Sequence, residues 1–228
     1  MKIIFPILLF IVLYGYNRQE GSDNFSFKSV ISDTPETEEV MPGTVPGNGV
    51  KYDNFVDSRD GKIYRTINIG QQVWMAENLN YDAGEGCWIY ENKPENAVIY
   101  GRLYNWETAN RSCPAGWHLP SGVDWNLLKE SLGGNNLAGG RMKASGTDLW
   151  RYPNVTSELL SGFSALPGGY YDKKGFFRFK GYACIFWSAK VMSEISSNFV
   201  ILFLNNDFFD DHGRSDMKTG FSVRCVMD

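Results

Sequence analysis

The segment CPAGWHLPSGVDWNLLKESLGG, residues 113–134, carries the clearest structural signal in this chain of 228 residues. Ser121 is a favourable helix N-cap, and Asp124 follows three residues later, where an acidic side chain can return a hydrogen bond to the cap. Large apolar residues beginning with Trp125 then recur at helical spacing until two glycines end the pattern. The sequence therefore predicts one main helix over residues 122–132.

Before this helix, the pattern is that of β-structure. An Asp-Gly turn signal at residues 60–61 precedes residues 62–69, where isoleucines on one strand face alternate with Lys, Tyr, Thr and Asn on the other. Residues 72–76 supply a second arm, so we expect a β-hairpin to open the domain. A short helix is expected around residues 103–110.

After Gly140 the chain consists of short aromatic segments separated by glycines. This pattern is typical of a small antiparallel sheet with long loops. The chain contains 7 Trp, 12 Tyr and 15 Phe beside 24 Gly, a mixture that favours short strands and turns over a helical bundle. The predicted fold class is therefore α+β, with small antiparallel sheets, one main helix and long irregular loops.

Charge and residue types exclude several kinds of function. The chain has 22 basic and 26 acidic residues, so it offers no broad cationic surface for nucleic acid. Its two histidines, His118 and His212, cannot supply a three-His zinc site, and neither His-Glu-x-x-His nor Cys-x-x-Cys spacing occurs. We therefore expect no metal site, no cofactor and no nucleic-acid partner.

The N-terminal segment is predicted to be an export signal. A mainly apolar stretch from Ile3 to Leu13 has the length of a signal-peptide core and is too short for a membrane-spanning helix. We expect residues 1–15 to be removed during export, which limits membrane contact to this transient signal. Tyr16 stands where a lipoprotein signal has its lipidated cysteine, so no lipid anchor is expected there.

Residues 16–50 are rich in Asp, Glu, Thr, Pro and Gly. Such a segment buries too little apolar surface to offset the entropy of ordering, so we expect a flexible acidic linker before a domain over residues 51–228. The expected location is extracellular, at the cell surface or in the periplasm, where disulfides can form. Three complete pairings are open to the four cysteines, which are Cys87, Cys113, Cys184 and Cys225.

Several motifs, in order along the chain, resemble one known domain family. They are GKIY at residues 61–64, IGQQVWMAENL at 69–79, YGRLYNW at 100–106, CPAGWHLPS at 113–121, GFSALPGG at 162–169 and GFSVRCV at 220–226. From Asp53 to Asp228 the chain resembles the Fibrobacter succinogenes major paralogous (FISUMP) domain, which is similar to the formylglycine-generating-enzyme branch of C-type-lectin-like folds. The resemblance implies that fold, with variable surface loops, in an exported surface protein of gut or rumen bacteria.

The same resemblance implies a disulfide between Cys113 and Cys225, because it places them in the two segments that close the domain. Ala97 stands where relatives often carry the partner of Cys87. Cys87 and Cys184 could then form a second disulfide, act as a redox or metal-binding thiol pair, or remain idle thiols.

Three motifs allow both a catalytic and a structural interpretation. His118 could act as a general base, but its position before a helix cap favours a hydrogen bond that holds a turn. Residues 134–141 are rich in glycine yet lack the Lys-Ser/Thr of a phosphate loop, so a turn into a short helix is expected. Ser164 lacks the second glycine of a nucleophile elbow and is interpreted as structural. No catalytic residue is predicted.

The candidate contact site is the loop over residues 205–214, which is rich in aromatic rings and charges. Its predicted ligand-binding residues are Asn205, Asn206, Asp207, Phe208, Phe209, Asp210, Asp211, His212 and Arg214. One alternative is that Phe208 or Phe209 fills the core. Another is calcium held by the Asn and Asp side chains, although the spacing favours a solvated acidic turn.

Residues 195–216 show a further bias in composition. These 22 residues contain no Lys, Glu, Gln, Met or Trp, which make up 41 of the 228 residues in the chain. About four would be expected by chance. Variation in the first two bases of Asn-type codons cannot produce these five residue types, and lectin-like proteins diversified by retroelements vary in this way. The bias therefore indicates a diversified surface.

The sequence thus predicts an exported, non-enzymatic recognition module that binds a glycan or a protein through its C-terminal loops. The alternatives are an enzyme of the formylglycine-generating type and a structural adhesin or pilus-tip component. An enzyme requires a closed pocket with convergent ionisable groups, whereas a binding module can present an open surface.

Overall fold

The computed structural model describes residues 50–155 and 160–228, all of which belong to the unit Pro46–Asp228. The predicted signal peptide, residues 1–15, lies outside the described residues, as does all but the last residue of the predicted linker, residues 16–50. Within the described ranges, no helix is long and apolar enough to cross a membrane.

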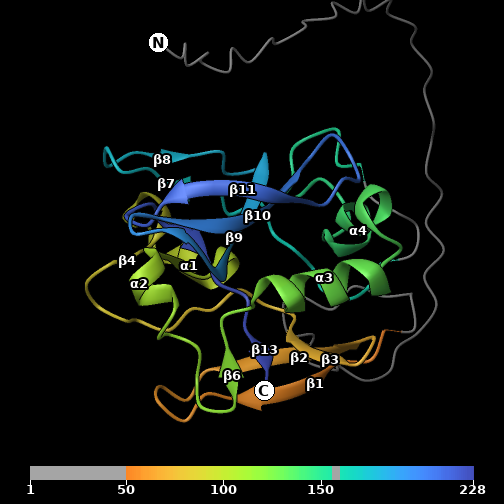
Figure 1. Ribbon diagram of the computed structural model, residues 1–228, viewed down its shortest axis with the longest axis horizontal. Helices are drawn as coiled ribbons and strands as arrows, with labels where there is room; N and C mark the ends of the chain where they lie inside the picture. Colours follow the sequence, from red (N-terminus) through yellow and green to blue (C-terminus); the bar gives the residue numbers. More distant parts are fainter. Residues whose placement is uncertain (1–49, 156–159) are drawn as a thin grey trace, which may run out of the picture. The chain divides into compact units, whose positions relative to one another are not determined.

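The strands form three sheets (Figure 1). The first has the order β1-β2-β3-β13-β6 and consists of β1 (Asp53–Val56), β2 (Ile63–Ile69), β3 (Gln72–Met75), β13 (Val226–Met227) and β6 (Trp117–His118). The second has the order β11-β10-β9-β12-β5-β4 and consists of β11 (Asp210–Asp216), β10 (Ser196–Phe203), β9 (Ala183–Ser193), β12 (Phe221–Ser222), β5 (Leu103–Tyr104) and β4 (Cys87–Trp88). A separate hairpin consists of β7 (Tyr170–Tyr171) and β8 (Phe177–Arg178).

Helices are short and few in the described part of the chain. They are α1 (Pro94–Tyr100), α2 (Trp106–Ala109), α3 (Gly122–Ser131) and α4 (Asn135–Met142), with the 3-10 turn η1 (Tyr90–Asn92). Figure 1 shows α3 between the two larger sheets. Small, mostly antiparallel sheets with few helices confirm the predicted α+β class.

The main helix begins where the sequence predicts. The Ser121 side chain accepts the backbone N–H groups of Val123 and Asp124, and the Asp124 side chain accepts the N–H of Ser121, which completes a capping box. Trp125 and Leu128 are buried on the side of α3 that faces the core. The helix ends at Ser131, one residue before the predicted end.

Two other helical segments differ in outcome. The expected short helix after Gly134 is confirmed as α4. The helix expected over residues 103–110 is limited to α2, because residues 103 and 104 pair with β12 and β4, and the Asn105 side chain then caps Thr108 N. Helix α1 is not predicted from the sequence.

Strands β9 and β10 separate two clusters of buried side chains. Residues on one face pack with α3 and α4, and they include Cys184, Phe186, Val200 and Leu202. Residues on the opposite face pack in a second cluster, and they include Ile185, Trp187, Phe199 and Ile201. Alternation along a strand thus gives this sheet two apolar faces, of which the second is only partly covered.

The expected β-hairpin is confirmed, because β2 and β3 pair antiparallel. On the face of β2 that carries the isoleucines, Ile67 and Ile69 are buried and Ile63 is 63% exposed. On the opposite face, Tyr64 is buried with Leu119 in the second cluster. Both faces of β2 therefore contribute to the core, so the alternation does not divide a buried face from a solvent face.

The Cys113–Cys225 disulfide implied by the family resemblance is confirmed, with Cα atoms 5.9 Å apart. It joins the segment before β6 to the residue before β13, so it closes a large part of the domain. Cys87 and Cys184 are free, which leaves the remaining thiols unpaired.

Arg224, beside this disulfide, is completely buried and forms no ion pair with an acidic side chain among the described residues. Its Nη2 donates to Asn78 Oδ1 at 2.6 Å, and its Nη1 donates to the carbonyls of Met75 and Phe163. The guanidinium lies 4.4 Å from the centre of the Phe163 ring. Burial lowers the pKa of Arg224 to about 9. Neutral acceptors therefore hold this cation, which fastens the last segment of the chain to the core.

Candidate functional site

The predicted contact loop, residues 205–214, is part turn and part strand. Residues 205–209 connect β10 to β11, and β11 is the edge strand of the six-stranded sheet. The exposed predicted contacts are Asn205, Asn206, Phe208, His212 and Arg214, whereas Asp207, Asp210 and Asp211 are half-buried and Phe209 is buried. The predicted site residues therefore divide into a surface set and an anchoring set.

Phe209 belongs to the core. Its side chain is 0% exposed, and its ring centre lies 6.3 Å from that of Trp125 in α3. Phe208 keeps 41% of its surface exposed. The prediction of Phe209 as a contact residue is corrected, because burial of its ring against α3 leaves nothing for a ligand to touch.

The turn before β11 is held against α4 by close backbone contacts. Gly140 N donates to Asp207 O at 3.2 Å. A Cβ on Gly139 would clash with the backbone of Phe208, and a Cβ on Gly140 would clash with the Asp207 side chain. The glycines of α4 thus allow the turn to pack on the helix. This packing accounts for the glycine-rich segment, and no phosphate-binding role is needed to explain it.

Lys143 follows α4 and binds the backbone at the same turn. Its Nζ donates to Phe203 O at 3.0 Å and to Asn206 O at 2.8 Å. Burial lowers the pKa of Lys143 to about 8, although the charge of Asp207 acts in the opposite direction. The ammonium group therefore holds the turn in place through two hydrogen bonds to backbone carbonyls.

The acidic residues at the start of β11 contact Lys129 and His212. Asp211 Oδ2 lies 3.3 Å from Lys129 Nζ, and His212 Nδ1 lies 3.2 Å from Asp211 Oδ1. Asp210 Oδ1 accepts the backbone N–H of His212 at 3.0 Å. In residues 50–155 and 160–228, no three His, Cys, Asp or Glu side chains are placed to hold a metal ion. The segment is an edge strand with paired charges.

A groove on the outer face of the six-stranded sheet lies beside this segment, with a cavity volume of about 510 Å³. Its floor comes from β9 and β10 and consists of Ala183, Ile185, Phe199, Ile201 and Phe203. Its walls are Tyr170, Phe179, Thr219 and Phe221, and its polar rim is Asp172, Lys173, Arg214, Ser215 and Asp216. The groove therefore joins an apolar floor and largely aromatic walls to a charged rim.

The floor depends on a glycine in β11. Gly213 pairs with Phe199 in the ladder between β10 and β11, and a Cβ at Gly213 would clash with the Phe199 ring. The ring centre of Phe199 also lies 5.1 Å from that of Phe221. The absence of a side chain at Gly213 thus leaves the space in which an aromatic ring of the groove lies.

Charges at the rim are mostly paired. Lys173 Nζ lies 3.4 Å from Asp216 Oδ2, which links the β7–β8 hairpin to β11. Arg178 Nε donates to Asp172 Oδ2 at 2.7 Å and holds the pKa of Asp172 below its usual range. The side chain of Arg214 makes no ion pair or hydrogen bond within the described residues, so its donors are available to a ligand.

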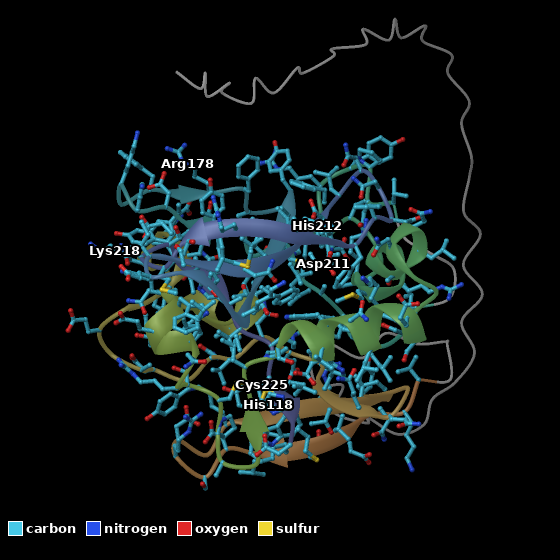
Figure 2. The ribbon with its side chains drawn as sticks, in the orientation of Figure 1. His118, Arg178, Asp211, His212, Lys218 and Cys225 are labelled. Carbon is cyan, nitrogen blue, oxygen red and sulfur yellow. A yellow bond between two sulfur atoms is a disulfide. The ribbon has the colours of Figure 1, made fainter. Side chains whose placement is uncertain are left out.

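His118 lies on β6, away from β11 (Figure 2). Its Nδ1 lies 2.7 Å from Asp228 Oδ1, and its Nε2 lies 3.3 Å from Asp124 Oδ2. Ser121 Oγ donates to the same Asp124 oxygen at 2.6 Å. The serine therefore contacts the carboxylate instead of the histidine, and the arrangement lacks the contact that activates a nucleophile. This favours the structural interpretation of His118.

Of the groove residues, sequence reasoning singled out only Arg214. Residues 199–203 read FVILF, an apolar run in which no polar residue marks the face that lines the groove. The bias in residues 195–216 is the signal that could have located it. Six lining residues come from that segment: Phe199, Ile201, Phe203, Arg214, Ser215 and Asp216.

The sequence profile of a family described as the Fibrobacter succinogenes major domain matches residues 67–227. This span contains every residue that lines the groove and both cysteines of the disulfide. No curated protein and no solved structure matches the chain.

Proposed function

Because the chain belongs to the Fibrobacter succinogenes major domain family, whose name states no activity, we propose its function from the groove. The protein is an exported, non-enzymatic recognition module that binds a glycan along the outer face of β9, β10 and β11. The observation that carries this proposal is the open groove of about 510 Å³, with an apolar floor, largely aromatic walls and a charged rim.

The lining of the groove suits a sugar chain. Phe179 and Phe203, which line it, are 42% and 38% exposed. One face of a pyranose ring carries mainly C–H groups, so stacking on these rings removes apolar surface from water. Arg214 and the rim carboxylates supply donors and acceptors for hydroxyl groups. Phe203, Arg214 and Asp216 of this lining lie within residues 195–216, where the composition indicates variation, which supports a recognition surface.

The charges of the groove support binding over catalysis. Catalytic groups are commonly held near neutral pKa and within reach of one another. Here the rim carboxylates Asp172 and Asp216 are both ion-paired. The pKa of Asp172 is held below its usual range mainly by the hydrogen bond from Arg178. The pKa of Asp216 is held below its usual range mainly by the hydrogen bond from the backbone N–H of Lys218. These groups remain ionised and suit hydrogen bonding to a ligand.

The positions of the free thiols argue against chemistry of the formylglycine-generating type, which needs two converging cysteines. Cys184 lies on β9 and Cys87 on β4, with β12 and β5 between them. Three strand spacings amount to about 14 Å, too far for a shared metal ion. Burial also raises the pKa of Cys184 to about 12, so its thiolate is disfavoured.

Export and the finer fold assignment belong to the same proposal. The Cys113–Cys225 disulfide supports a location outside the cytoplasm, where such bonds persist. The α+β arrangement, with the disulfide near β6 and β13, supports a C-type-lectin-like fold of the formylglycine-generating-enzyme branch. Mass spectrometry of the N-terminus of the mature protein tests export: we expect removal of residues 1–15 and no lipid on Tyr16.

A glycan array with matched variants tests the binding function. Phe203→Ala removes a ring that lines the groove, and Phe208→Ala removes a similarly exposed ring from the turn outside it. We expect capture by wild type, loss with Phe203→Ala and retention with Phe208→Ala, at unchanged melting temperatures. Loss with Phe208→Ala alone would move the site to the predicted loop, and capture of no glycan by wild type would contradict the proposal.

A further inference from the structure

A second cleft, with a cavity volume of about 460 Å³, shares Phe179 with the groove. It is bounded by β8, by residues 179–182 that follow β8, and by η1. Its side chains are aromatic or charged throughout, in contrast to the aliphatic residues that contribute to the groove floor. Two neighbouring clefts of different character thus lie on either side of one ring.

Positive charge dominates the second cleft. Three cations, Arg151, Arg178 and Lys180, line it against one carboxylate, Glu91. Of these cations, Arg178 is paired with Asp172, which is not part of the lining. Glu91 Oε2 lies 3.1 Å from Lys93 Nζ outside the lining and 4.0 Å from Lys180 Nζ. The cleft is therefore cationic in a chain whose formal net charge is -4, so its local charge favours an anionic ligand.

Arg151 is positioned without using its charged group. Its backbone N–H donates to Gly181 O at 2.8 Å, and its side chain crosses Gly181, where a Cβ would lie 3.1 Å from Arg151 Cγ. Its guanidinium lies 4.9 Å from the centre of the Tyr182 ring. Within the described residues no acceptor contacts this guanidinium. Its donors can therefore bind a carboxylate in a bidentate manner.

Phe179 adopts a backbone conformation that bulky residues rarely adopt, with φ of +63°. Its carbonyl accepts the N–H groups of Tyr182 at 2.9 Å and Ala183 at 3.2 Å, and its ring stacks on Tyr170 with centres 5.9 Å apart. Residues of this kind persist where the surroundings hold them, and they gather at binding sites. Here the conformation holds an exposed ring at the boundary between the groove and the cleft.

We propose that the second cleft binds the carboxylate groups of an acidic polysaccharide whose neighbouring sugars lie in the groove. This inference rests on the proposed function and names its ligand class as a polymer containing uronic acids. Arg151 takes the carboxylate, Lys180 adds positive charge, and the exposed rings of Phe179 and Tyr182 take the sugar faces. The rings beside the cations favour a sugar chain over an acidic peptide, which offers carboxylates without flat C–H faces.

The test compares polygalacturonate with its fully methyl-esterified form, which keeps the sugar rings and loses the charge. Titrations use the full mature chain in low salt, where charge effects are largest. We expect wild type to bind polygalacturonate about tenfold or more tightly than the ester, as one charge-assisted bidentate contact allows. Arg151→Gln should remove this preference.

Two variants make the result specific. Arg111→Gln makes the same change of charge at an exposed arginine that lines neither cleft, and it should leave the preference unchanged. Phe203→Ala should weaken binding of both polymers, because it alters the groove. Melting temperatures of all variants should match wild type, since each altered side chain is exposed.

Four outcomes would overturn the inference. Equal binding of polygalacturonate and its ester by wild type, with loss in Phe203→Ala, would leave the proposed function standing and remove the acidic ligand. Equal loss of preference with Arg111→Gln would show diffuse electrostatics instead of a site. Binding of polyglutamate as tight as that of polygalacturonate would indicate an acidic peptide, and failure to bind either sugar polymer would count against both proposals.

Discussion

Two adjacent phenylalanines in the turn before β11 should respond in opposite ways to truncation. Phe209 is 0% exposed, packs against Trp125 and lies under Lys129 Nζ at 6.0 Å. Phe208 is 41% exposed, and its contact with Gly139 is made by backbone atoms that an alanine retains. The pair therefore separates anchoring of the turn from exposure on its surface.

The magnitude for Phe209→Ala follows from its burial. Truncation of a buried Phe to Ala removes transfer free energy and leaves a cavity, at a cost of about 3–5 kcal/mol in the free energy of unfolding. For a domain of this size the melting temperature should then fall by about 6–20 °C. Phe208→Ala should cost about 1 kcal/mol or less, because its ring is already partly in water.

Thermal and urea denaturation of the full chain, with the disulfide intact, measure both variants. The urea midpoint should fall sharply for Phe209→Ala and hardly at all for Phe208→Ala, with equal slopes. Equal losses in both variants would refute the assignment of Phe209 as the anchor. A stable Phe209→Ala variant would refute it as well, and would return Phe209 to the set of candidate contacts.

Three further predictions concern the disulfide, Phe179 and Lys143. Reduction of the Cys113–Cys225 bond, which closes a separation of 112 residues, should destabilise the domain by up to about 4–5 kcal/mol, and an unchanged melting temperature in reductant would contradict this. Phe179→Gly should have a free energy of unfolding about 1 kcal/mol higher than Phe179→Ala, because glycine tolerates φ of +63°. A higher free energy of unfolding for Phe179→Ala would contradict the strained conformation. Because burial lowers the pKa of Lys143 to about 8 from 10.5, the unfolded chain binds more protons between these values. The difference in free energy of unfolding between wild type and Lys143→Met should therefore shift in favour of wild type as the pH rises across that interval in urea titrations. A difference that does not change with pH would contradict burial of the ammonium group.

The parts of the fold that the sequence predicts are those set by local chemistry. Helix α3 is defined by the cap at Ser121, by the acidic side chain of Asp124 and by the apolar spacing after it, and none of these depends on the rest of the chain. The disulfide was implied by family resemblance, since spacing alone leaves three pairings open. The exposure of Ile63 could not be predicted from the sequence, because it depends on which part of the sheet the other segments cover.

The groove could not be predicted because it depends on tertiary packing. The run from Phe199 to Phe203 is apolar on both faces, so strand periodicity cannot tell the core face from the groove face. The different fates of Phe208 and Phe209 depend on how the turn packs on the glycines of α4. Arg214 is predicted as a contact residue because it ends a segment that is rich in charges and aromatic rings.

Amide hydrogen exchange, with and without the glycan that binds best on the array, tests recognition at the groove most directly. We predict slower exchange on binding in β10, in residues 213–216 of β11 and in the β7–β8 hairpin, because these segments surround the groove. Exchange in β1 and β2 should be unchanged. Protection confined to residues 205–212, or absent from β10 and the hairpin, would contradict binding in the groove.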